Sequence, residues 1–121
     1  MTYDLIIIGA GPAGVAAAVY ASRQKLSILM LSKDMGGQVA KKAVDIENYP
    51  GFEKISGPEL VELYEKQLKA NELEVTLAEV TGIEKKDNLF TVTASGKRKR
   101  TQSSALFNAG YPRASIVSTA I

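Results

Sequence analysis

The feature of this sequence that most limits its fold is the glycine-rich segment Gly9–Gly14, GAGPAG, near the start of the chain. The mostly apolar run Asp4–Ile8 precedes it and is typical of a buried parallel strand, while small, helix-favouring residues follow as far as Ser22. A strand, a glycine turn and a helix in this order begin a βαβ unit that binds a dinucleotide. We therefore predict a binding site for a nucleotide diphosphate here.

The small residues of this segment have different physical roles. Gly9 allows a sharp turn off the strand, where a side chain would make the required φ unfavourable. Gly11 lets a pyrophosphate approach the main chain, and Gly14 lets the helix lie close to the strand. Pro12 suits the start of a helix, whose unpaired N–H groups and dipole attract phosphate.

A second buried strand is predicted at Leu26–Leu31, parallel to the first through a right-handed crossover. In dinucleotide-binding folds an acidic residue commonly ends this strand and accepts hydrogen bonds from the ribose. Ser32 occupies that place here, followed by Lys33 and Asp34, so the acid is missing or displaced. We predict that Ser32 donates a hydrogen bond to a ribose or phosphate oxygen instead.

The remaining pattern predicts an α/β fold. Ser56 and Glu59 have the spacing of a capping box, which begins a helix that runs to about Ala70. We expect a third strand at Leu73–Leu77 and a β-hairpin or small meander near residues 80–95. The fold class predicted is therefore a Rossmann-like βαβ domain with a parallel sheet, helices against it and an added hairpin or meander.

Composition excludes several kinds of chemistry. The 121 residues are enough for one domain and contain neither cysteine nor histidine, so disulfides, thiolate nucleophiles and Ser-His-Asp arrangements are excluded. We assign no catalytic residue and no metal site. The net charge of +2 does not indicate a nucleic-acid partner, and the basic run Lys97–Arg100 is interpreted as a solvated turn rather than a phosphate or localisation patch.

No membrane partner is predicted, because no apolar run approaches the roughly 18 residues of a membrane span. The first residues lack the pattern of a secretory signal, so a cytoplasmic location is expected.

Two further segments carry a family resemblance. GAGPAG at 9–14, GGQ at 36–38, and IENYPGF at 46–52 with ISGPEL at 55–60 follow one another here as they do in thioredoxin reductase and its close relatives. These are the low-molecular-weight flavoprotein disulfide reductases, and the chain resembles them over about residues 1–97. The resemblance implies that the nucleotide is FAD, reduced by NADPH and oxidised by a cysteine pair that passes electrons to a disulfide.

The family pattern also implies roles for individual positions. Gly9, Gly11, Ala13 and Gly14, with Pro12 between them, would lie at the pyrophosphate, and Leu31 and Ser32 beside the adenosine ribose. The flavin side of the cofactor would lie along Gly36, Gly37 and Gln38. Asn48 would contact the flavin or its ribityl chain, and the main chain of Val80 would lie near the adenine.

The chain departs from this family in three ways. In the family the redox cysteine pair lies in a pyridine-nucleotide domain inserted after this segment, and a C-terminal segment completes the FAD domain; the resemblance leads us to expect neither part within these 121 residues, which contain no cysteine. Asn108–Gly110 and Pro112-Arg113 only partly match the expected ATG turn and downstream Pro-Arg. We therefore expect an incomplete FAD domain at 1–97 and a tail at 98–121 that is diverged, truncated or frame-shifted.

The function expected is that of the FAD-binding portion of a thioredoxin-reductase-like oxidoreductase, unable to turn over alone. The alternative is a non-catalytic nucleotide-binding or interaction module that keeps the Rossmann fold. A small NAD(P)-binding sensor domain is a third hypothesis, disfavoured because it does not need the GGQ and ENYPG segments. Uncovered sheet edges and apolar surface also lead us to expect self-association.

Overall fold

The centre of the molecule is a parallel sheet. A computed structural model of the chain describes residues 2–41, 45–86, 89–95, 100–106 and 117–118. The strands of the central sheet are, in spatial order, β10 (Val117–Ser118), β2 (Leu5–Ile8), β3 (Ile28–Ser32) and β6 (Val75–Leu77). All three neighbouring pairs are parallel, with Ile8 opposite Leu31 at the carboxyl ends of β2 and β3.

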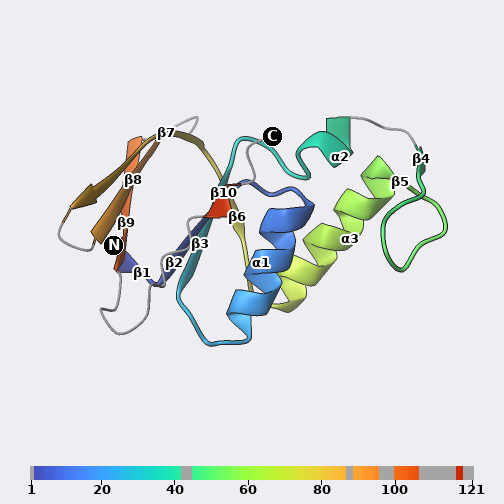
Figure 1. Cartoon of the computed structure of the whole chain (residues 1–121), viewed down its shortest axis with the longest axis horizontal. Helices are drawn as coiled ribbons and strands as arrows, with labels where there is room; N and C mark the ends of the chain where they lie inside the picture. Colours follow the sequence, from blue (N-terminus) through green and yellow to red (C-terminus); the bar gives the residue numbers. More distant parts are fainter. Residues whose placement is uncertain (1, 42–44, 87–88, 96–99, 107–116, 119–121) are drawn as a thin grey trace.

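A layer covers each face of this sheet (Figure 1). Helices α1 (Pro12–Ser22) and α3 (Gly57–Ala70) lie on one side. On the other side lies a second sheet, whose strands in order are β1 (Thr2–Tyr3), β9 (Arg100–Leu106), β8 (Leu89–Ser95) and β7 (Glu79–Lys86). A short helix, α2 (Gln38–Lys41), and a small two-stranded unit, β4 (Asp45–Ile46) with β5 (Ile55–Ser56), complete the described part.

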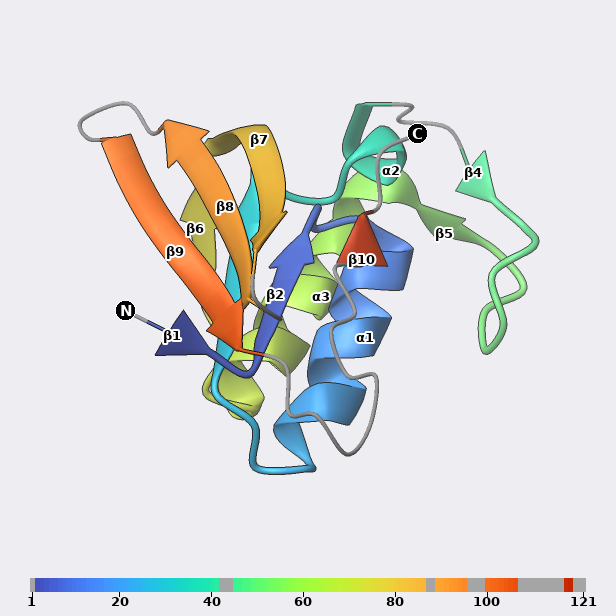
Figure 2. The ribbon, with the colours of Figure 1, turned by 60° about the vertical axis from the view of Figure 1, so that its left-hand side comes forward.

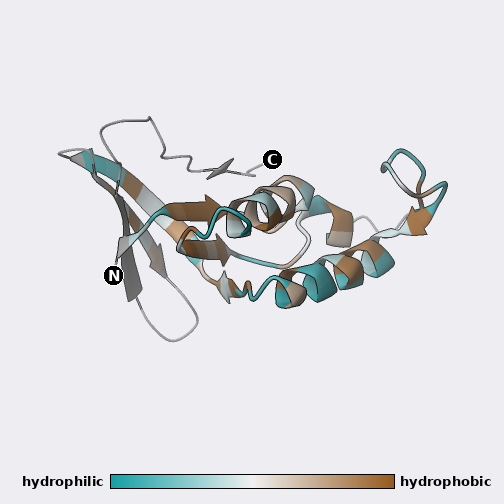
Figure 3. Cartoon of the chain, turned by 90° about the horizontal axis from the view of Figure 1, so that it is seen from below, coloured by the Kyte–Doolittle hydropathy of each residue, from teal (hydrophilic) through white to brown (hydrophobic). Residues whose placement is uncertain are grey.

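The apolar runs of β2 and β3 are explained by burial on both faces. Ile7 and Met30 face the helices and pack in one core cluster with residues of α1 and α3. Their neighbours Ile6 and Leu31 face the other way and pack with Val92 of β8. Because side chains alternate along a strand, two opposed cores require consecutive apolar residues. Figure 3 shows the result as apolar colouring over both strands.

The predicted βαβ unit is confirmed, with small differences at the ends of elements. The third strand begins two residues later than expected, at Val75, because the Leu73 N–H donates to the Leu68 carbonyl and still belongs to the end of α3. The capping box of α3 is present: the Ser56 hydroxyl accepts from the Glu59 N–H at 3.3 Å, and the Glu59 carboxylate accepts from the Ser56 N–H at 3.4 Å.

The predicted hairpin is also confirmed as β7 and β8, and β9 extends it into a meander. The hairpin turn 87–88, most of the basic run and the partial match at 108–113 lie outside the described residues. Within the tail, β10 pairs with Ile7 and Ile8 of β2 (Figure 2), so this edge of the central sheet is covered over two residues. Among the helices of the described ranges, none has both the length and the apolarity to cross a membrane.

Candidate nucleotide-binding site

The glycine turn lies where β2 ends, at the carboxyl edge of the parallel sheet. Gly9 has a φ of +104°, a conformation that residues with a side chain rarely adopt, so the predicted role of this glycine is supported by the backbone. Its N–H donates to the Leu31 carbonyl at 2.7 Å, which joins the turn to the end of β3. The turn is therefore held in place by the sheet rather than by its own side chains.

Helix α1 begins at this turn with an open end. Gly11 is the N-cap residue and offers no side-chain hydrogen bond, and the first turn contains no acidic residue. A Cβ built on Gly11 would meet nothing nearer than the Gly36 carbonyl oxygen at 3.9 Å, among the described residues. The first N–H groups of a helix have no intrahelical partner, so this end carries donors and a positive dipole at the carboxyl edge of the sheet, although Gly11 itself is buried. Such a cradle fits a phosphate.

The second glycine segment lies directly against the first. The Gly36 N–H donates to the Ala10 carbonyl at 2.9 Å, and a Cβ built on Gly37 would lie 3.6 Å from the Gly11 Cα. Gly36 itself has a φ of +90°, and a Cβ there would lie 2.4 Å from Cγ2 of Val61 on α3. Two motifs that are far apart in the sequence are thus in direct main-chain contact.

Ser32 holds these two segments together. Its buried hydroxyl accepts a hydrogen bond from the Ala10 N–H at 3.2 Å and donates to the Asp34 carbonyl at 2.5 Å. The hydroxyl has one proton, and that proton is already directed at the main chain of the loop. In this arrangement the side chain positions the glycine turn and has no proton left for a ribose oxygen.

The other predicted positions differ in their access to a ligand. Leu31 is 1% exposed, so only its main chain is available, whereas Gln38 is exposed at the start of α2. Val80 is half-buried and packs against the core cluster that contains Leu31, close to the end of β3. Of the small residues of α1, Pro12 and Ala13 lie in its first turn and Gly14 is buried against the sheet.

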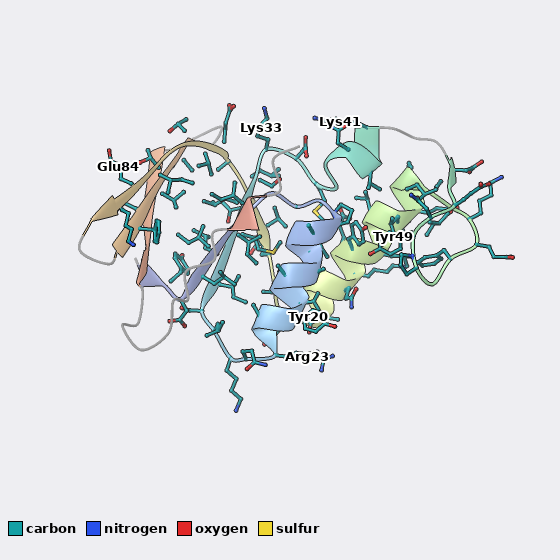
Figure 4. The ribbon with its side chains drawn as sticks, viewed as in Figure 1. Tyr20, Arg23, Lys33, Lys41, Tyr49 and Glu84 are labelled. Atoms are coloured by element: carbon teal, nitrogen blue, oxygen red, sulfur yellow. The ribbon has the colours of Figure 1, made fainter. Side chains whose placement is uncertain are left out.

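Asn48 is exposed on the loop between β4 and β5, which extends beyond α3 and away from the glycine turn (Figures 1 and 2). The loop is anchored by Tyr49, whose ring centroid lies 6.3 Å from that of Tyr64 on α3 and 6.2 Å from that of Phe52. Figure 4 shows Tyr49 at this anchor point. The structure therefore brings the two glycine segments together but leaves Asn48 on a separate element.

Charged side chains border the same edge of the sheet. Lys33 Nζ lies 3.7 Å from Glu79 Oε1, and Lys41 Nζ lies 3.3 Å from Asp34 Oδ2. Both lysines lie at the end of the molecule where α1 begins, opposite Tyr20 and Arg23 near its other end (Figure 4). Glu79 could not be singled out from the sequence, because its proximity to Lys33 depends on the pairing of strands that are distant in the sequence.

The fold and this site define a dinucleotide-binding domain of the Rossmann type. The chain belongs to the pyridine nucleotide-disulphide oxidoreductase family, whose model matches residues 3–110. This is a family of flavoprotein oxidoreductases, and the resemblance to its thioredoxin reductase members is confirmed.

Three relatives illustrate the match. The chain is 64% identical to thioredoxin reductase of Bacillus subtilis over 59 residues, which is 48% of this chain and 18% of that protein. It is 42% identical to thioredoxin reductase of Listeria monocytogenes over 96 residues, covering 78% and 30% respectively. The solved thioredoxin reductase of Streptococcus pyogenes superposes with a TM-score of 0.73 at 37% identity, over 84% of this chain and 33% of that one. The chain thus spans a third or less of these relatives.

Proposed function

We propose that this chain binds FAD, with the pyrophosphate at the glycine turn and the first turn of α1. The observation that carries the proposal is the N-terminus of α1, whose N-cap Gly11 gives no side-chain hydrogen bond, whose first turn has no acid, and which lies against the main chain of Gly37. Burying a diphosphate there would satisfy donors that have no partner inside the helix. The family membership supports a flavin nucleotide as the ligand.

The proposed contacts follow the path of an extended dinucleotide from this point. The phosphates lie at Gly9, Gly11, Ala13 and Gly14, beside Pro12. The adenosine lies over the end of β3, near the main chain of Leu31, Ser32 and Val80. The flavin half lies along Gly36, Gly37 and Gln38, and Asn48 reaches it only if the β4–β5 loop closes toward the sheet.

The proposed role of this chain is to bind and orient the flavin nucleotide of a thioredoxin-reductase-like system. Bound FAD would supply hydride and electron transfer, and the protein would position it and limit side reactions. The sequence contains no cysteine, so this chain has no dithiol to receive electrons from the flavin. We therefore propose that it does not complete a catalytic cycle by itself.

Several earlier predictions remain proposals of the same kind. These are the division into a domain at 1–97 and a tail at 98–121, self-association and a cytoplasmic location. The outer edge of β6 supports the self-association, because in the described part of the chain this strand pairs with β3 alone.

The test is the absorbance spectrum of the purified chain after incubation with FAD and gel filtration. The proposal predicts a yellow protein with a flavin spectrum and no NADPH-dependent reduction of a disulfide. A colourless protein that also fails to quench FAD fluorescence contradicts FAD binding. Disulfide reduction by the chain alone contradicts the proposed loss of turnover. Flavin binding without any exchange of electrons with added reductase domains would favour the non-catalytic module.

A further inference from the structure

The carboxyl end of β3 offers no carboxylate that can accept hydrogen bonds from both hydroxyls of a ribose. Dinucleotide-binding folds place an acidic residue there. In this chain Leu31 is 1% exposed and packs with Val92 in the core between the central sheet and the meander. The Ser32 hydroxyl is committed to the main chain of Ala10 and Asp34. A carboxylate at the ribose of this chain would therefore be supplied by another element.

The start of β7 brings a carboxylate to this place. The Ala78 N–H donates to the Ser32 carbonyl at 2.8 Å, which joins the segment after β6 to the end of β3. Glu79 is the next residue, and its carboxylate oxygen lies 3.7 Å from Lys33 Nζ. The Glu79 side chain is 61% exposed, so it is accessible to a ligand that lies over the end of β3.

Asp34 is the competing carboxylate, since it follows β3 in the sequence. Its side chain lies 3.3 Å from Lys41 Nζ, which draws it toward α2. Its carbonyl is fixed by the Ser32 hydroxyl. The Asp34 side chain therefore lies toward α2 and the loop that leads to Gly36. Glu79 lies at the start of β7, beside the end of β3, where the adenosine half of the nucleotide is proposed to bind.

We propose that Glu79 is the carboxylate that recognises the ribose of the adenosine half, and that Lys33 holds it in place. The inference rests on the proposed binding of FAD and adds a specificity-determining residue to that site. A carboxylate accepts hydrogen bonds from both hydroxyls of a ribose, and it disfavours a nucleotide that carries a phosphate on either of them.

Whether nucleotide affinity falls or rises when the charge of Glu79 is removed distinguishes a carboxylate that binds the ribose from one that only lies nearby. A carboxylate that does not touch the sugar only repels the diphosphate, so removing its charge would strengthen nucleotide binding. A carboxylate that accepts hydrogen bonds from the ribose hydroxyls contributes more than this repulsion removes. Glu79→Gln should therefore weaken binding, and only for nucleotides that carry these hydroxyls.

The experiment measures FAD affinity by fluorescence quenching, and then displaces FAD with ADP or with dideoxyadenosine diphosphate, which lacks both ribose hydroxyls. Variants are Glu79→Gln, Asp34→Asn and the matched control Glu84→Gln. Glu84 is exposed on the same strand β7 but lies at the far side of the meander (Figure 4). Circular dichroism checks that each variant is folded.

We expect Glu79→Gln to weaken FAD and ADP binding about tenfold and to leave the dideoxy nucleotide unchanged or slightly tighter. Asp34→Asn should bind all three as tightly as the wild type or slightly tighter, because it loses only a repulsive charge, and the more distant Glu84→Gln should bind all three as the wild type does. The inference is overturned if Glu79→Gln binds ADP as tightly as the wild type or more tightly. It is also overturned if Glu79→Gln loses the same affinity for ADP and for the dideoxy nucleotide, or if Asp34→Asn weakens ADP binding as much as Glu79→Gln does. A wild-type chain that binds no FAD overturns the proposed function and this inference together.

Discussion

The two long helices of this chain begin in opposite ways. Both have a proline in the first turn. Helix α3 satisfies its own N-terminus, because Ser56 and Glu59 exchange hydrogen bonds between side chains and main chain. Helix α1 has glycine at its N-cap and no acid in its first turn. In α3 the N–H groups of Ser56 and Glu59 therefore have side-chain partners, whereas the N-cap of α1 gives no such hydrogen bond among the residues that the structure describes.

This contrast assigns the N-terminus of α3 a role in stability and the N-terminus of α1 a role in binding a ligand. A capping box stabilises a helix by about 1 kcal/mol without any partner molecule. The end of α1 gives up that stabilisation, and it faces a second glycine segment where a side chain would fill the space. The comparison predicts that changes at α3 alter stability alone, and that changes at α1 alter nucleotide binding.

The largest effect is expected at Gly36, which lies between the turn before α1 and Val61 of α3. Gly36→Ala should lower the free energy of unfolding by about 2–4 kcal/mol, because the new Cβ meets Val61 in a left-handed backbone conformation. Urea unfolding followed by circular dichroism measures this. The double variant with Val61→Ala should recover part of the loss by removing the clash; no loss in the single variant would contradict the packing described.

The second change breaks the proposed phosphate cradle. Gly11→Val should weaken FAD binding at least about a hundredfold, because the side chain occupies the place of the pyrophosphate. The cost in stability should be about 1–3 kcal/mol, because the φ of −80° suits valine but Gly11 is buried and its Cβ would lie 3.9 Å from the Gly36 carbonyl oxygen. The matched control is Gly82→Val on β7, where a Cβ meets nothing within 4 Å, and FAD titration should show no change there.

The third change tests the self-contained end of α3. Ser56→Ala should lower the free energy of unfolding by about 1 kcal/mol, because the Glu59 N–H loses its acceptor. FAD affinity should remain that of the wild type, and Ser56→Thr should restore the stability. A loss of FAD affinity in Ser56→Ala without a loss of stability would reverse the assignment of the two helix ends.

The smallest effect is expected inside α3, at Tyr64. Its buried hydroxyl has no hydrogen-bond partner among the described residues, so Tyr64→Phe should change stability at neutral pH by less than about 1 kcal/mol. Burial, with a smaller contribution from Tyr49, raises the pKa of Tyr64 above its usual value of 10.0. The unfolded chain therefore loses this proton first.

The sign of the pH dependence follows from this order. The stability that the protonated Tyr64 contributes is complete below about pH 10 and declines as the pH rises above it. Urea unfolding from pH 8 to pH 11 should show a decline in the wild type that is smaller in Tyr64→Phe. Equal declines in the two proteins would show that Tyr64 ionises as readily in the folded chain as in the unfolded chain.

Local features of the fold could be predicted from the sequence. The turn at Gly9 and the capping box of Ser56 and Glu59 depend on residues within a few positions of each other, so their spacing in the sequence is enough. The apolar runs of β2 and β3 likewise indicate burial on both faces before any partner is known.

Features that depend on distant pairing could not be predicted in this way. The contact of Gly37 with Gly11 and the proximity of Glu79 to Lys33 result from how strands and loops pack. The role of Ser32 was predicted from its place in the sequence alone, and only the fold shows that the turn itself takes up its hydroxyl.

The most direct test of the difference between the two helix ends is an NMR titration of the amide groups with ADP. If the end of α1 binds the diphosphate, the amide resonances of Gly11, Ala13 and Gly14 should shift strongly, while those of Gly57, Glu59 and Leu60 at α3 should stay in place. Shifts of similar size at both helices, or none at α1, would contradict the account.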